Sequence, residues 1–128
     1  MDAVLDRLLK AYGRELELYE EIAELARESV RLARIQAPLS ELNGVNERKQ
    51  RCLREIDSVE RSIALDKERW RLEGRAHLRA TELDGLLSRL GASIEATLRH
   101  ERETDRWILS ASGLDQHHDS APERNSLR

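Results

Sequence analysis

Four histidines and one cysteine are the side chains of this chain best suited to metal binding or nucleophilic chemistry. A di-metal helical bundle needs Glu-x-x-His on facing helices, but glycine and threonine stand three residues before His77 and His100. Asp115-x-x-His118 has the spacing but falls in a polar segment without a scaffold for coordination. The sequence therefore predicts incidental surface histidines and neither a metal nor another cofactor.

Nucleophilic catalysis is also not indicated. Cys52 is the single cysteine, it has no CxxC partner, and it falls inside a helical pattern. Such a residue is typical of a small buried structural thiol in a reducing compartment. The chain also has no phosphate-binding glycine loop and no Gly-x-Ser-x-Gly motif. We therefore predict that the protein is not an enzyme.

The composition predicts which elements must position any functional residue. The chain has 128 residues, of which 37% are charged, and its six Gly and two Pro leave little material for turns. These values favour an all-α fold. Its 22 basic and 25 acidic residues argue against a dedicated nucleic-acid binder. The start of the chain lacks a signal-peptide pattern and no run of about 20 apolar residues occurs, which predicts a cytoplasmic protein without membrane insertion.

Apolar spacing predicts three long helices. The first, from Asp2 to Gln36, has nine apolar residues at alternating spacings of three and four, here called the first seam: Leu5, Leu9, Tyr12, Leu16, Tyr19, Ala23, Ala26, Val30 and Ala33. Five further residues widen this stripe and predict more than one packing partner: Leu8, Leu18, Ile22, Leu25 and Leu32. Six glutamates at the centre of this helix are expected to pair with the basic second helix.

The second helix is predicted from Pro38 to Glu73, with Asn43-Gly44 as an alternative early break and Gly74 as the residue that ends it. Its core positions are Leu42, Val45, Lys49, Cys52, Ile56, Val59 and Ile63. Thr81 resembles the cap of a third helix. Apolar residues follow it with helical spacing: Leu83, Leu86, Leu87, Leu90, Ile94 and Leu98. These elements predict an elongated antiparallel bundle or coiled coil of three helices over residues 1–109, followed by a flexible polar tail, 110–128.

Apolar side chains near the end of the third helix are candidates for partner binding. Ile94, Leu98 and the triplet Trp107-Ile108-Leu109 border a charged stretch where core packing is predicted to run out. The triplet either packs on the end of the bundle as a clamp or contributes to a partial hydrophobic groove for a partner helix. Both interpretations fit the pattern.

Three segments resemble the flagellar export chaperones of the FlgN type. They are the opening helix around Leu16-Glu17-Leu18-Tyr19-Glu20-Glu21-Ile22, the segment from Leu39 to Ile63, and Leu83-Asp-Gly-Leu86-Leu87-Ser-Arg-Leu90. The resemblance covers residues 5 to 109, and the segment Glu101-Arg102-Glu103-Thr104 departs from the asparagines that the family often carries there.

The resemblance implies a non-catalytic cytoplasmic chaperone. Such proteins bind the C-terminal amphipathic helices of hook–filament junction proteins and deliver them to components of the flagellar type III export apparatus. Mapped onto this chain, the expected cargo contacts are Ile94, Leu98, Trp107, Ile108 and Leu109. The alternatives are a structural coiled coil that self-associates as a homodimer, which the unbroken first seam motivates, and a chaperone for another flagellar or type III cargo.

Overall fold

The computed structural model describes residues 1–74 and 76–112, which form four helices and no strand. The helices are α1 (Asp2–Arg34), α2 (Leu39–Ser62), α3 (Ala64–Glu73) and α4 (Ala80–Ser112). The all-helical class is confirmed, with four helices in place of the three predicted. α4 extends three residues into the segment predicted as a tail, and residues 113–128 lie outside the described residues.

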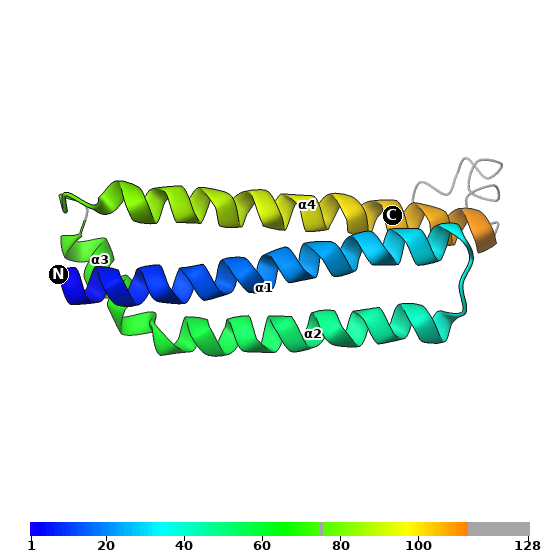
Figure 1. Ribbon diagram of the computed structural model, residues 1–128, viewed down its shortest axis with the longest axis horizontal. Helices are drawn as coiled ribbons and strands as arrows, with labels where there is room; N and C mark the ends of the chain where they lie inside the picture. The colour runs from blue at the N-terminus through cyan, green and yellow to red at the C-terminus, as the bar shows by residue number, and fades with distance from the viewer. Residues whose placement is uncertain (75, 113–128) are drawn as a thin grey trace, which may run out of the picture.

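α1 lies in the middle of the molecule, with α4 on one side and α2 on the other (Figure 1). In the described part of the chain, no Cα of α2 or α3 lies within 8 Å of a Cα of α4. α2 runs antiparallel to α1, and α4 runs parallel to it, as the first and third long helices of an antiparallel bundle do (Figure 1). The reason is topological, because α2 and α3 together return the chain to the end at which α1 begins.

The central position of α1 explains its wide apolar stripe. Toward α4, Leu5, Tyr12 and Leu16 form a cluster with Leu83 and Leu90. Toward α2, the residues that flank the first seam, Leu18, Ile22, Leu25 and Leu32, pack in two clusters with Val45, Cys52 and Ile56. The prediction of more than one packing partner is confirmed. Three positions of the first seam are only half-buried: Leu9, Tyr19 and Ala23.

A residue in the left-handed conformation follows the end of α1. Gln36 has φ 55°, a conformation in which glycine is the usual residue. The N–H of Ala37 donates to the carbonyl of Leu32 at 2.9 Å, and that of Gln36 donates to Ala33 at 3.1 Å. These two bonds satisfy carbonyls of the last turn and reverse the chain toward α2.

The predicted second helix is two helices. α2 begins at Leu39 and continues through Asn43-Gly44, but Ile63 (φ −113°, ψ 12°) separates it from α3. The Ser62 hydroxyl donates to the carbonyl of Val59 at 2.6 Å, a bond that competes with the helical backbone. Because of the break, Ile63 is buried in the cluster that α1 forms with α4.

Two local predictions were wrong. Thr81 is not a cap, since α4 begins at Ala80 and the N–H of Arg79 donates to Nδ1 of His77 at 3.0 Å just before it. The predicted pairing of the α1 glutamates with the second helix is also not seen among the described residues. In the ion pairs that join α1 to α2 and α3, α1 supplies the arginine and the other helix supplies the carboxylate. Arg14 contacts Glu55 of α2 at 2.6 Å, and Arg7 contacts Asp66 of α3 at 2.8 Å. Glu24 and Glu28 instead pair with arginines three residues along α1, which are within easier reach.

Candidate functional site

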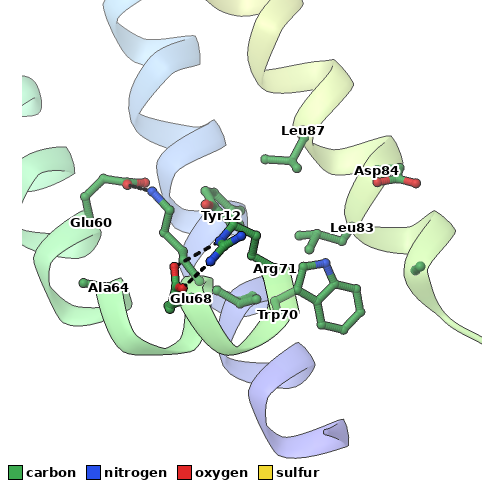
Figure 2. A pocket seen from close by; sticks show the side chains of 12 residues that line it. Tyr12, Glu60, Ala64, Glu68, Trp70, Arg71, Leu83, Asp84 and Leu87 are labelled. Atoms are coloured by element: carbon green, nitrogen blue, oxygen red, sulfur yellow. Dashed lines mark hydrogen bonds and ion pairs between the residues drawn. The ribbon is translucent and has the colours of Figure 1, made fainter. Parts of the chain in front are cut away.

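A pocket of about 820 Å³ opens where α3 bends away from α2, and we call it the bend pocket (Figure 2). It lies between the first half of α1, the α2–α3 bend and the first turns of α4. Its apolar and aromatic walls are Leu8, Tyr12, Ala64, Trp70, Ala80, Leu83 and Leu87. Its charged residues are Glu60, Lys67, Glu68, Arg71 and Asp84. The pocket exists because α3 and α4 both pack on α1 without packing closely on each other.

Trp70 forms the wall of the pocket that α3 contributes, and its position depends on a glycine. A Cβ on Gly74 would lie 2.2 Å from Cδ2 of Trp70, so the indole occupies the space of the missing side chain. Gly74 ends α3, as predicted, but with φ −89° it is not left-handed. The Trp70 ring also lies 5.8 Å from that of His77, whose Nε2 contacts Asp2 at 2.6 Å. These contacts join the start of α1 to the segment before α4.

The charges around the bend pocket are unevenly paired. Lys67 Nζ lies 2.6 Å from Glu60, and Arg71 lies 2.5 Å from Glu68, as the dashed lines in Figure 2 show. Asp84 forms no ion pair or hydrogen bond with another described residue. The two cations are therefore neutralised locally, and within residues 1–74 and 76–112 the Asp84 carboxylate has no cation paired with it.

A buried carboxyl group lies next to this pocket. The Glu15 side chain is buried in α1, and its pKa is raised to about 8, first by burial and then by the neighbouring Glu60. When ionised, Glu15 leaves Oε2 buried with no hydrogen-bond partner among the described residues. When protonated, it donates a hydrogen bond to Glu60, whose pKa is correspondingly lowered. Glu15 is therefore a neutral acid near pH 7. Burial likewise raises the pKa values of Tyr12 and Tyr19.

Beyond the pocket, α4 carries three exposed apolar side chains that we call the α4 row. They are Leu87, Ile94 and Leu98, which are 41%, 37% and 47% exposed. Glu101 reaches across to Lys49 of α2 at 2.8 Å, and Ile94 and Leu98 precede Glu101 by seven and three residues. Residues with these spacings share one side of a helix, so the row lies on the side of α4 that faces α2.

The structure divides the five predicted partner-binding residues between different sides of α4. Ile94 and Leu98 belong to the α4 row. Trp107 follows Leu98 by nine residues, which places it about 180° further round the helix. Its ring lies 5.6 Å from the guanidinium of Arg34, a cation–π contact to the end of α1. Trp107, Ile108 and Leu109 are 38%, 41% and 41% exposed.

Comparison of the chain with protein-family models, with curated proteins and with solved structures gave no significant match.

The histidines and the cysteine have different environments. Cys52 is buried, as predicted, and burial raises the pKa of its thiol. His77 is not an incidental surface residue, because it contacts both Asp2 and Trp70. His117 and His118 lie outside the described residues. Among residues 1–74 and 76–112, no group of three or more His, Cys, Asp or Glu side chains is placed to hold a metal ion. None of the helices in this part of the chain has the length and apolar character needed to cross a bilayer.

Neither Trp70 nor Glu15 was predicted as a site residue, although the sequence around each carries a signal. Trp70 precedes Gly74 by four residues, the spacing at which a bulky side chain lies over a helical neighbour. Leu8 and Ile22 lie seven residues before and after Glu15, so the three side chains share one side of the helix. The helical spacing alone therefore pointed to a buried carboxyl group in α1.

Proposed function

We propose that this chain is a non-catalytic helix-binding protein, a cytoplasmic export chaperone of the FlgN type. Its cargo would be the C-terminal amphipathic helices of hook–filament junction proteins, which it delivers to the flagellar type III export apparatus. The observation that carries the proposal is the α4 row, in which three large apolar side chains stay exposed along one side of α4. Amphipathic helices bind such surfaces through apolar anchors on successive turns.

The dimensions of the α4 row fit a helix. Leu87 and Leu98 are eleven residues apart, which corresponds to about 16 Å along α4, or three turns. The core face of α4 also weakens along its length, from Leu83 and Leu90 to the smaller Thr97 and Thr104. The second half of α4 therefore contributes little apolar surface to the molecule's own core, while Ile94 and Leu98 stay exposed. This arrangement supports a surface that is completed by a partner.

Calorimetric titration with C-terminal segments of hook–filament junction proteins from the source organism tests the proposal. Saturable binding near micromolar with a negative heat-capacity change is expected. Ile94→Ala and Leu98→Ala should each weaken binding by about tenfold. Because both side chains are exposed, the free energy of unfolding in urea should change little. Trp107→Ala is the matched control on the opposite side of α4 and should leave the affinity unchanged. Loss of binding only in Trp107→Ala would assign the cargo site to that opposite side.

A second copy of the chain is the competing occupant of the α4 row. Light scattering over a range of concentrations separates the two functions. A monomer at all concentrations that binds the segments supports the chaperone. A dimer that Leu98→Ala dissociates, together with no heat from any segment, would overturn the chaperone in favour of the self-associating structural protein.

A further inference from the structure

We infer that the bend pocket is an anchor site, which holds the end of a bound amphipathic helix that carries a bulky apolar side chain beside a lysine or arginine. This inference rests on the proposed function, since it names the part of the partner that enters the pocket. Three observations carry it: the volume of the pocket, its continuity with the α4 row, and the charge of Asp84, which has no ion-pair partner among the described residues.

The volume and walls of the pocket match a short piece of helix. One helical turn is 5.4 Å long and about 10 Å across, so it fills about 420 Å³. The 820 Å³ of the bend pocket are therefore comparable in volume to about two turns. Trp70 on α3 and Leu83 and Leu87 on α4 lie around this space (Figure 2). Binding pockets are lined mostly by hydrophobic and aromatic side chains such as these, which suit a large apolar anchor.

The pocket continues the surface to which the partner helix is proposed to bind. Leu87 lines the bend pocket and is also the first residue of the α4 row. A helix that lies along Leu98 and Ile94 and extends toward the start of α4 therefore reaches the pocket without a change of direction. The α2–α3 break at Ile63 makes this possible, because α3 turns across the start of α1 there.

The charge of the pocket selects the chemistry of the anchor. Lys67 and Arg71 are each neutralised by a glutamate of α2 or α3, and Asp84 has no cationic partner among the described residues. A lysine or arginine one turn from the apolar anchor would supply the missing counter-charge. A partner with an acidic residue at that position would be repelled.

Trp70 provides a direct readout of the pocket. In a Trp107→Phe variant it is the single tryptophan, and it is half-buried beside the pocket. Titration with the C-terminal segment of a hook–filament junction protein should shift its emission to shorter wavelength, because the bound anchor removes water from the indole. If calorimetry shows that the segment binds but the emission of Trp70 does not shift at saturation, the inference is overturned and the proposed function stays in place.

Filling the pocket should weaken binding. Ala64 lines the pocket and is exposed, so Ala64→Phe adds a ring at its wall without disturbing the core. The matched control is Leu65→Phe at the next position, which is 83% exposed and does not line the pocket. We expect about tenfold weaker binding for Ala64→Phe and none of this loss for the control. Equal affinities for the two variants contradict the inference.

The charge is tested separately by Asp84→Asn. It should weaken binding of the segment about threefold at low salt, and the difference should shrink at high salt. Replacing the basic residues of the segment by glutamine should remove the effect of Asp84→Asn. An effect that persists with the glutamine segment refutes the charge assignment. If no segment binds the unaltered protein at all, the proposed function fails and the anchor site fails with it.

Discussion

Replacing Glu15 by glutamine should stabilise the protein at neutral pH and remove part of its pH dependence. The side chain is only 3% exposed, and its pKa is raised from 4.5 to about 8 by burial and by Glu60. In the unfolded chain the carboxyl ionises near its ordinary pKa, so folding takes up a proton between these two values. The contribution of Glu15 to stability is therefore complete below pH 4.5 and is lost as pH rises toward 8. At about 1.4 kcal/mol per pH unit, the loss at pH 7 is about 3 kcal/mol.

Urea unfolding followed by helical circular dichroism measures this loss. Glutamine keeps the shape of the protonated acid and donates to Glu60 at every pH. The difference in unfolding free energy between Glu15→Gln and the unaltered protein should be near zero at pH 4.5 and grow steadily toward pH 8. Carboxylates paired with arginine, such as Asp66, have lowered pKa values and act in the opposite direction, but they cancel in this difference.

Glu20→Gln is the control for this experiment, since it removes the same charge from an exposed position of α1. The difference in unfolding free energy between Glu20→Gln and the unaltered protein should not grow between pH 4.5 and pH 8. A pH-independent difference for Glu15→Gln, or a variant less stable at every pH, would refute the argument that Glu15 is buried as a neutral acid.

Three further predictions concern stability, each measured by urea unfolding. Gln36→Gly should raise the unfolding free energy by about 1 kcal/mol, because glycine adopts the left-handed conformation without strain, and no gain would contradict the assignment of that conformation. Gly44→Ala should stabilise α2 by about 1 kcal/mol, because a Cβ there meets open space. Gly74→Ala should instead lower the unfolding free energy, because its Cβ would overlap the indole of Trp70. Changes of the same sign for the two variants would refute this distinction. Thr104→Val should raise the unfolding free energy by about 1 kcal/mol, because it removes a buried hydroxyl that has no partner among the described residues. Thr97→Val should not, because the Thr97 hydroxyl donates to the carbonyl of Ser93. A larger gain for Thr97→Val than for Thr104→Val would overturn this prediction.

Helical spacing predicted the parts of the fold that depend on local sequence. The bounds of α1 were correct to within two residues, and Val45, Cys52 and Ile56 were assigned to the core of α2. These predictions succeed because the period of a helix determines which side chains share a side. Charge patterns were less informative, since Glu17, Glu24 and Glu28 pair with arginines three residues away on α1 itself.

The site depends on features that the spacing does not contain. The bend pocket requires the break at Ile63, where the Ser62 hydroxyl bonds to the carbonyl of Val59 and Ile63 is buried against residues of α1 and α4. The predicted partner-binding residues were chosen because they border a charged stretch where core packing was predicted to run out, without regard to their angular positions on the helix. The nine-residue step from Leu98 to Trp107 was available in the sequence and would have separated them.

The parallel arrangement of α1 and α4 has a consequence for the order in which the chain folds. Contacts along this arrangement join residues of nearly constant separation, 75 for Asp2 with His77 just before α4 and 69 for Arg34 with Glu103 within it. No contact between α1 and α4 is therefore local, and every one closes a long loop. α1 and α2, by contrast, are joined by a short turn and pair progressively outward from it. We expect α2 to pack on α1 first and α4 to dock later as a preformed helix, which makes that docking the slow step of folding.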